Sequence, residues 1–157
     1  MGHGYDVHRL ADGRALILGG VAIPYEKGLL CHSDADVLLH AVMDALLGAA
    51  AMGDIGKHFP DSDAAFFGCS SLDLLERVRA MLAEQGWDVV NVDATVVAQR
   101  PKIAPYLLQM RKNIAKALDI TVNQVNVKGT TEEKLGFTGD GSGMAAHAVC
   151  IVEQKQS

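Results

Sequence analysis

The sequence predicts an α+β fold, in which a single domain holds a mixed β-sheet with helices packed on one face, in a ferredoxin-like arrangement. The length of 157 residues suits one domain with a substantial core. Apolar residues make up 49% of the chain and charged residues 21%, as is usual for globular proteins. Strand-like and helix-like segments are mixed along the chain, without an internal repeat or a low-complexity linker.

Alternating or continuous apolar runs, bounded by turn residues, predict the strands of this sheet. The expected strands are residues 4–10, 14–25, 87–99, 125–131 and 143–154. Within the second of these segments, the Gly19–Gly20 pair indicates a turn or a bulge. That segment is therefore either a pair of strands or one bent strand.

The clearest helix is expected over residues 32–53. Ser33 suits its N-cap, because a serine hydroxyl can accept a hydrogen bond from a free backbone N–H of the first turn. Asp34 and Asp36 then fall in that first turn, where the helix dipole favours negative charge. Gly53 can end the helix.

Two further amphipathic segments predict helices over residues 70–86 and 105–119. Gly86 suits the C-terminal stop of the first, and Pro105 suits the start of the second. The apolar stripe of the first consists of Leu72, Leu75, Val78, Met81 and Leu82.

The charge and the cysteines exclude several classes of protein. A net charge of −5 without a basic tract argues against nucleic acid as a partner. Cys31, Cys69 and Cys150 are odd in number and lack C-x-x-C spacing, so we expect reduced thiols in a cytoplasmic protein. The first five residues do not resemble a signal peptide, and the longest apolar run, residues 45–53, is shorter than the roughly 20 residues that span a bilayer. We therefore expect no membrane partner.

The stretch GYDVHRL, residues 4–10, carries an acid and an imidazole two positions apart. In a strand, Asp6 and His8 project from the same face, because side chains alternate between faces. A carboxylate and an imidazole are ligands that zinc accepts. The alternative is a solvated strand face without a metal.

A third ligand is needed, and His40 in the first helix is a candidate. Asp36, His40 and Asp44 are spaced four residues apart and so run along one helix face. One interpretation is a surface histidine bonded to either acid. The other is a metal ligand whose tautomer is fixed by one of these carboxylates.

Four loops contain groups that suit a phosphorylated ligand, and each also has a purely structural interpretation. Residues 31–36 are either a phosphate site at the mouth of the first helix or a well-capped helix start. Residues 53–63 either hold a polyol through Asp54 and backbone amides or form a plain turn.

The third loop, residues 98–105, is stiffened by two prolines. In one interpretation, its backbone hydrogen-bonds a flat heterocycle and Lys102 contacts a phosphate. In the other, it is a simple connection between a strand and a helix. In the fourth, residues 128–139, Thr130 and Glu133 match the S/T-x-x-E capping box. Thr131 and Glu133 also suit a diphosphate with a divalent cation, because a Glu that holds Mg²⁺ or Mn²⁺ attracts phosphates.

Four blocks of the sequence resemble one family, the 2-C-methyl-D-erythritol 2,4-cyclodiphosphate synthases of non-mevalonate isoprenoid biosynthesis. The blocks appear in the order of the family and cover most of the chain. They are GYDVHRL, IPYEKGLLCHSDADVLLHAVMDALLGAAAMGDIGKHFPDSD, DATVVAQRPKIAPY and VNVKGTTEEKLGFTG. HSDADVLLHA and KGTTEEKLGFTG are the most specific parts of this match.

The resemblance implies a function for each candidate group. The family releases CMP from 4-diphosphocytidyl-2-C-methyl-D-erythritol 2-phosphate as it closes the cyclic diphosphate. Zinc ligands would be Asp6, His8 and His40, a second ion, Mg²⁺ or Mn²⁺, would bind Glu133, and His32 and Thr131 would be catalytic. The family assembles as a homotrimer with active sites between subunits, so residues 1–157 would form one synthase domain of such a trimer.

The resemblance also implies the substrate-binding residues. Those around the metal and the methylerythritol phosphate are Asp6, Val7, His8, His32, Ser33, Asp54, Ile55, Gly56, Phe59, Pro60, Asp61, Ser62 and Asp63. Those around the cytidine are Ala98, Gln99, Arg100, Pro101, Lys102, Ile103 and Ala104. Those around the diphosphate are Thr130, Thr131, Glu132 and Glu133, with Phe137 as a further contact.

One segment departs from the family, which commonly reads GFTGRGEG where this chain reads GFTGDGSG. Asp140 stands in place of an Arg that is associated with phosphate contact and with an isoprenoid diphosphate cavity on the trimer axis, and Ser142 stands in place of a Glu. An Asp carboxylate cannot donate to an anion, so that cavity is not expected to bind a diphosphate here.

Two rival functions are compatible with parts of the pattern. A zinc phosphohydrolase would share the metal site but would use water as the attacking group. A trimer that senses CDP compounds without catalysis would bind them without releasing CMP, although a mere binder has little use for a zinc ion with an open position.

Overall fold

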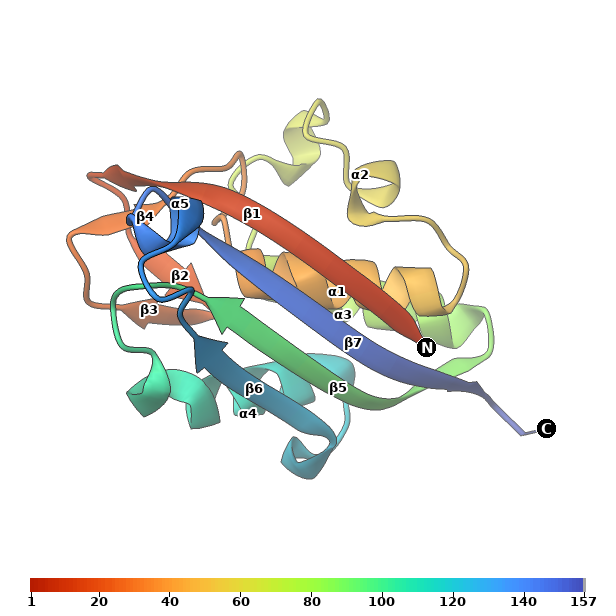
Figure 1. Cartoon of the computed structure of the whole chain (residues 1–157). Coiled ribbons are helices and arrows are strands. Elements are labelled where there is room, and N and C mark those ends of the chain that lie inside the picture. Colours follow the sequence, from red (N-terminus) through yellow and green to blue (C-terminus); the bar gives the residue numbers. More distant parts are fainter. Residues whose placement is uncertain (157) are drawn as a thin grey trace.

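Five strands form one mixed sheet in the order β4-β1-β7-β5-β6 (Figure 1). The structure is a computed structural model that describes residues 1–156. The strands are β1 (Gly2–Asp12), β4 (Lys27–Leu29), β5 (Trp87–Val97), β6 (Val125–Thr130) and β7 (Gly143–Gln154). β1 runs antiparallel to β4 and β7, and β7 runs antiparallel to β5, whereas β5 and β6 are parallel. The predicted α+β class with a mixed sheet is therefore confirmed.

A separate hairpin joins β2 (Leu16–Leu18) to β3 (Val21–Ile23). Its turn is the Gly19–Gly20 pair, and both glycines have positive φ angles, 57° and 72°. Of the two expectations for residues 14–25, the strand pair is thus the one that forms. The short strand β4 was not expected from the sequence.

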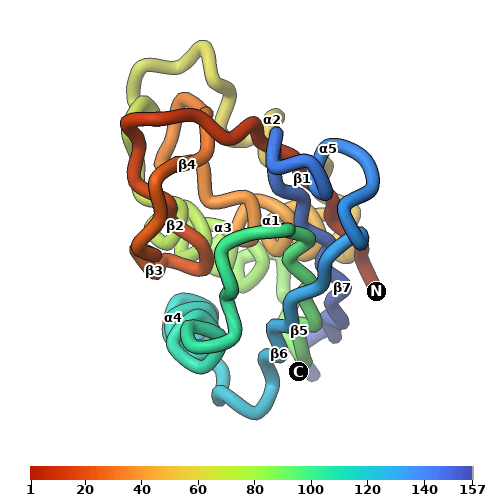
Figure 2. The backbone as a smooth tube through the Cα atoms, turned by 60° about the vertical axis from the view of Figure 1, so that its left-hand side comes forward, coloured from red at the N-terminus to blue at the C-terminus, as the bar shows by residue number. Residues whose placement is uncertain are grey.

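Three long helices cover one face of the sheet, as predicted. They are α1 (Val37–Ala49), α3 (Ser71–Glu84) and α4 (Leu107–Leu118). In Figure 1, α1 runs behind β1 and β7, and Figure 2 shows the helices gathered on one side of the strands. The short helical elements are α2 (Ile55–His58), η1 (Ala64–Phe66), η2 (Ala104–Tyr106), η3 (Val122–Gln124) and α5 (Gly136–Gly139).

The core lies between the sheet and the helices, and α1 is its centre. Ten of the 13 residues of α1 are buried, because the sheet covers one side of the helix and α3 packs on another. Among the described residues, no helix combines the length and the apolar character needed to cross a membrane.

Strand β1 lies unusually close to α1 because it carries glycine at two positions that face the helix. A Cβ on Gly2 would overlap the carbonyl oxygen of Ala45, and a Cβ on Gly4 would overlap that of Ala41. Asp6 and His8 follow at the next two positions that face the same way. The glycines therefore let the functional end of β1 approach α1 closely.

The predicted start and end of the first helix were wrong. α1 begins at Val37 rather than at residue 32, because Ala35 has a left-handed φ of 58°, which is incompatible with a helical turn. Asp36, not Ser33, is the N-cap, and its carboxylate accepts a hydrogen bond from Leu39 N–H at 3.1 Å. Asp34 consequently lies outside the helix. At the other end, the helix stops at Ala49 instead of continuing to Gly53, and Ala51 has a φ of 55°.

The other predicted helices and strands agree with the structure to within a few residues. Helix α3 has Ser70 at its N-cap, and Gly86 follows it with a φ of 78°. The third predicted helix starts with the 3₁₀ turn η2 and continues as α4. The closing strand runs over residues 143–154, as expected.

Candidate active site

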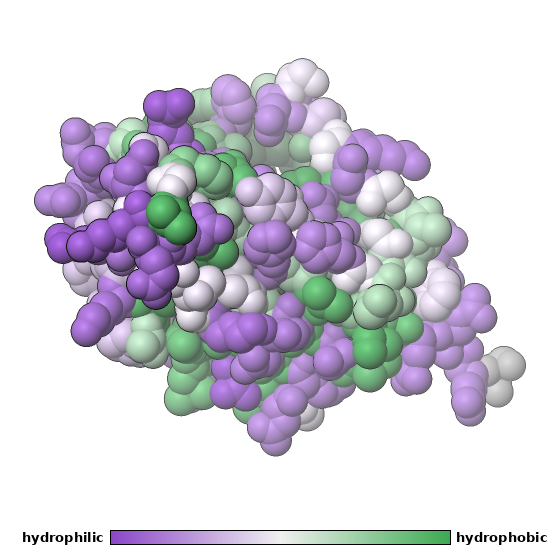
Figure 3. Space-filling view, viewed as in Figure 1, coloured by the Kyte–Doolittle hydropathy of each residue, from purple (hydrophilic) through white to green (hydrophobic). Residues whose placement is uncertain are grey.

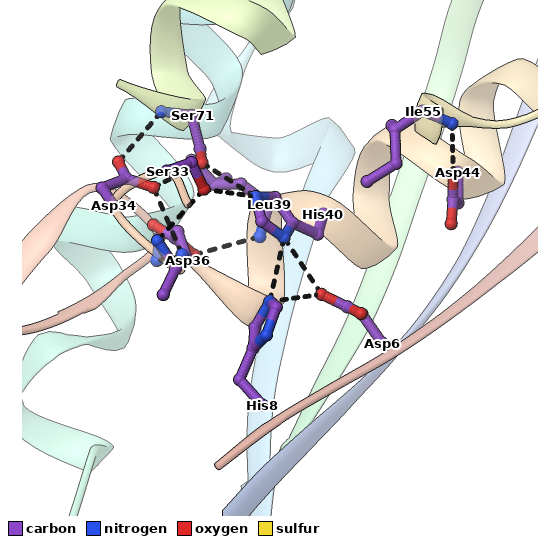
Figure 4. A network of polar contacts seen from close by, with 12 residues as sticks. Asp6, His8, Ser33, Asp34, Asp36, Leu39, His40, Asp44, Ile55 and Ser71 are labelled. Atoms are coloured by element: carbon purple, nitrogen blue, oxygen red, sulfur yellow. Dashed lines mark hydrogen bonds and ion pairs between the residues drawn. The ribbon is translucent and has the colours of Figure 1, made fainter. Parts of the chain in front are cut away.

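Three potential metal ligands converge where β1 passes over α1 (Figure 4). Asp6 Oδ2 lies 2.9 Å from His8 Nε2 and 3.0 Å from His40 Nδ1. The two histidine nitrogens are 3.1 Å apart. Asp6 and His8 project from one face of the strand, as the period-2 pattern predicts, and α1 brings His40 to them.

The chemistry and the spacing of these three atoms fit a zinc ion. Tetrahedral zinc with bonds of about 2.0–2.1 Å separates its ligand atoms by about 3.3 Å, slightly more than the 2.9–3.1 Å found here. Side-chain exposure falls from 24% for Asp6 to 13% for His8 and 7% for His40, so the group is open on one side only. Across residues 1–156, it is the one cluster of three or more His, Cys, Asp or Glu side chains able to hold a metal.

The three side chains also perturb one another electrostatically. Burial opposes ionisation of Asp6, but the hydrogen bonds and charges of His40 and His8 outweigh it and hold the pKa of Asp6 well below its usual range. Burial likewise opposes a charge on His40, whereas Asp6 outweighs it and raises the pKa of His40. Asp6 is therefore held in its ionised form, which is the form of a carboxylate that binds a metal.

The predicted partners of His40 were wrong. Asp36 turns away to the β2–β3 turn, where its carboxylate accepts N–H donors from Gly19 at 3.0 Å and Gly20 at 2.8 Å. Asp44 accepts from the N–H of Ile55 at 2.8 Å. Neither carboxylate bonds the His40 ring, which is buried rather than on the helix surface.

The second ring nitrogen of His40 instead faces two serines. His40 Nε2 lies 3.1 Å from Ser71 Oγ and 3.3 Å from Ser33 Oγ. Ser71 and its partner Asp34 were not identified from the sequence as part of the site. No spacing in the sequence links them to His40, because α3 reaches this position through the tertiary fold.

A cavity of about 50 Å³ borders the metal-ligand group, because His40 is one of its lining residues. His32, Ser33, Ile55, Phe59 and Asp61 line it, all of them predicted substrate-binding residues. Its other lining residues are Cys31, His40, Met43, Phe66, Phe67 and Leu74.

Aspartate side chains cap the short helices of residues 54–66, which contribute to the lining of this cavity. Asp54 caps α2 by accepting from Lys57 N–H at 2.9 Å, and Asp63 accepts from Ala65 N–H at 2.9 Å. Phe59 and Phe66 pack edge to face, with ring centroids 5.3 Å apart. At the mouth of α1, the structure shows a capped helix start, because the Asp36 side chain accepts the N–H of Leu39.

A second cavity, of about 230 Å³, contains the predicted cytidine segment. Ala98, Gln99, Pro101, Lys102, Ile103 and Ala104 line it together with Leu107, Gly129, Thr130 and Thr131. Arg100 does not line this cavity but faces a neighbouring one, together with Tyr25, Lys27 and Lys134. Six of the seven predicted cytidine residues are thus brought together with both predicted threonines.

The predicted capping box at residues 130–133 does not form. Glu133 and Lys134 have left-handed φ angles of 53° and 65°, so a turn replaces the expected helix start. Thr131 Oγ1 accepts the N–H of Glu133 at 3.3 Å, while the Glu132 carboxylate accepts the hydroxyl of Thr138 at 2.6 Å. Glu133 is exposed, and so is Phe137 at the start of α5.

The departure from the family pattern at residues 140–142 has a local structural role. Asp140 Oδ1 accepts both the N–H of Ser142, at 2.8 Å, and its hydroxyl. These two hydrogen bonds lower the pKa of Asp140. Asp140 and Ser142 thus close a turn on each other before β7 begins.

Comparisons with known proteins agree with this geometry. The YgbB family matches residues 1–153. A 2-C-methyl-D-erythritol 2,4-cyclodiphosphate synthase of Trichlorobacter lovleyi is 63% identical over 152 residues, which are 97% of each chain. One of Clostridium novyi is 59% identical over 155 residues, 99% of each chain.

Solved structures show the same similarity. The IspF–CDP complex of Plasmodium falciparum has a TM-score of 0.85 and 35% identity, over 99% of this chain and 96% of that one. The bifunctional IspDF of Campylobacter jejuni has a TM-score of 0.95 and 42% identity, and this chain spans 42% of that longer chain. The two relatives named above are 2-C-methyl-D-erythritol 2,4-cyclodiphosphate synthases. The family match over residues 1–153 and these identities show that the chain belongs to the YgbB family.

Proposed function

We propose that the chain converts 4-diphosphocytidyl-2-C-methyl-D-erythritol 2-phosphate to 2-C-methyl-D-erythritol 2,4-cyclodiphosphate and CMP, a lyase reaction of non-mevalonate isoprenoid biosynthesis. The convergence of Asp6, His8 and His40 beside the cavity lined by His32 and Ser33 is the observation that carries this proposal. The group offers three ligands and leaves one side open for a phosphate oxygen.

The reaction needs positioning more than a protein nucleophile. The 2-phosphate of the substrate attacks the β-phosphorus, and a phosphate oxygen is already ionised at neutral pH. A zinc ion on Asp6, His8 and His40 would supply Lewis acidity toward the β-phosphate. His32 and Thr131 would donate hydrogen bonds to oxygens that gain charge.

The loop from Asp54 to Asp63 would hold the methylerythritol part and keep water from the reacting phosphorus. Its packing of Phe59 against Phe66 gives this side of the cavity an apolar wall. The segment from Ala98 to Ala104 would bind the cytosine ring and ribose. Glu133 would hold Mg²⁺ or Mn²⁺ on the diphosphate, for which its exposed carboxylate is available.

We infer further that the active protein is a homotrimer, with each site formed between two subunits. The metal-side cavity and the cytidine-side cavity share no lining residue, so neither of them holds all the groups that the reaction needs. The sheet face opposite the helices exposes apolar side chains that an interface would bury. Tyr5 is 48% exposed, Val7 38%, Val149 39% and Ile151 44%.

Figure 3 shows polar and apolar side chains mixed on the face of the molecule turned to the viewer. On the sheet face opposite the helices, Lys128 and Asp93 form an ion pair at 2.6 Å. Light scattering of the purified protein tests the assembly: a mass three times that of the 16.7 kDa chain supports the trimer, and a fully active monomer contradicts it.

Three other properties belong to the same proposal. Residues 1–157 would form one cyclodiphosphate synthase domain, its sheet and helices would have the ferredoxin-like arrangement, and the protein would act in the cytoplasm on a small molecule. The three free cysteines fit a reducing compartment.

Phosphorus NMR of the zinc-loaded protein with its substrate tests the function. The synthase gives a cyclic diphosphate together with CMP in equal amount. A linear phosphorylated product would identify a hydrolase that uses water, and binding without release of CMP would identify a sensor. Either of these results would replace the proposed reaction.

A further inference from the structure

Ser71 is a buried hydroxyl at the first residue of α3, and it lies against the far side of His40 from the metal-ligand group. Figure 4 shows Ser71 and His40 connected, with Asp34 beyond the serine. Ser71 Oγ is 3.1 Å from His40 Nε2 and 2.5 Å from Asp34 Oδ1. The serine therefore stands between an imidazole and a carboxylate.

The hydrogen bonds at Asp34 fix the direction in which the serine donates. Asp34 Oδ2 accepts the N–H of Ser71 at 2.9 Å, and Oδ1 accepts the N–H of Asp36 at 3.2 Å. Both oxygens thus act as acceptors, and the hydroxyl of Ser71 donates its one proton to Asp34. Toward His40, Ser71 Oγ can then only accept.

It follows that Nε2 of His40 carries a proton, because it must donate to Ser71. In a neutral imidazole the other nitrogen then has a free lone pair. That nitrogen, Nδ1, is the one that lies 3.0 Å from Asp6 and 3.1 Å from His8. The chain Asp34–Ser71–His40 therefore selects the tautomer that can bind a metal at the Asp6–His8–His40 group.

We propose that Ser71, oriented by Asp34, is a positioning residue that sets the zinc affinity of the site through the tautomer and the ring orientation of His40. The proposal rests on the zinc site of the proposed function. It adds that the hydrogen-bond partner of His40 on the side away from the metal is a residue of α3, and not one of the acids of α1.

Ser33 is the alternative partner of Nε2, and its contact is weaker. Its oxygen is 3.3 Å from His40 Nε2 and already accepts the N–H of Ala35 at 3.2 Å. Nothing holds the Ser33 proton in one direction, so this hydroxyl does not determine the tautomer. Ser33 is also only partly buried, whereas Ser71 has no exposed surface.

Zinc affinity of Ser71→Ala, measured by competition with a chromogenic chelator in the absence of substrate, tests the proposal. We expect a loss of about 10–100-fold, as for other partners of metal-bound histidines. The matched control is Ser70→Ala, because the neighbouring serine makes no side-chain capping hydrogen bond, and its zinc affinity should equal that of the wild type. Equal affinity in Ser71→Ala and Ser70→Ala would overturn the proposal.

A measurement on the unmodified protein covers the case in which Ser71→Ala does not fold. In the zinc-loaded wild type, ¹⁵N-edited NMR should show His40 with a protonated, slowly exchanging Nε2 and a metal-bound Nδ1. The opposite pattern, with zinc on Nε2, would refute the tautomer selection. Both readouts are independent of turnover, so tight zinc binding without cyclisation would refute the proposed reaction and leave this inference intact.

Discussion

Replacing Gly4 by alanine should separate the two elements that carry the metal ligands. The new Cβ would lie 2.8 Å from the carbonyl carbon of Ala41 and 2.8 Å from the amide nitrogen of Ala45, and closer still to the carbonyl oxygen of Ala41. Ordinary van der Waals contact begins at 3.4 Å. All three atoms belong to the backbone of α1, which cannot rotate away as a side chain can. Strand β1 must therefore move from the helix by roughly an ångström.

The size of the effect follows from this displacement. Overpacking of a tight core contact costs about 1–3 kcal/mol. For a chain of this length, each kcal/mol lowers Tm by about 2–4 °C. The 3.0 Å separation of Asp6 Oδ2 and His40 Nδ1 would open to about 4 Å, beyond the roughly 3.3 Å between ligands of tetrahedral zinc. Zinc affinity and turnover should each fall by about 100-fold.

Gly48→Ala is the matched control, because Gly48 lies in α1 itself and a Cβ there meets nothing within 4 Å. It should raise stability by about 0.5–1 kcal/mol, the usual gain from removing a helical glycine. The assays are thermal unfolding and zinc content after dialysis, on both variants and the wild type. A Gly4→Ala protein with unchanged Tm and a full complement of zinc would refute the close approach of β1 to α1.

Three further predictions concern single side chains. His40→Ala should lose zinc and nearly all turnover while circular dichroism shows the fold kept, and normal turnover without bound zinc would count against the ligand assignment. Glu133→Ala should weaken the dependence of turnover on Mg²⁺ or Mn²⁺, and an unchanged dependence in a less stable protein would instead assign a structural role to this side chain. Burial raises the pKa of Cys150 from 9.0 to about 11, so at pH 8 iodoacetamide should label Cys31 and Cys69 well before Cys150. Equal labelling rates at the three cysteines would contradict this.

The parts of the site that depend on local periodicity could be predicted from the sequence. Asp6 and His8 share a face because a strand has a period of two residues, and the strand formed as expected. The convergence of His40 with them depends on the distance between β1 and α1, which Gly2 and Gly4 determine. No periodicity contains that information, and the resemblance to a known family supplied the ligand set instead.

The errors in the bounds of the first helix and in the capping box occurred where a residue other than glycine adopts a left-handed backbone conformation. Ala35 delays the start of α1, and Glu133 and Lys134 prevent the capping box that their sequence matches. Alanine and lysine give no signal for a positive φ, in contrast to the Gly19–Gly20 turn, which was recognised. Ser71 was missed for a different reason, because only the packing of α3 on α1 brings it to His40.

Zinc K-edge X-ray absorption of the purified protein tests the metal site most directly. Coordination by Asp6, His8 and His40 predicts one zinc per chain with only nitrogen and oxygen neighbours at about 2.0–2.1 Å, including the scattering of two imidazoles. Cys31 lines the cavity beside this group and offers the alternative ligand. A sulfur neighbour at about 2.3 Å, or a protein that is fully active without zinc, would contradict the assigned site.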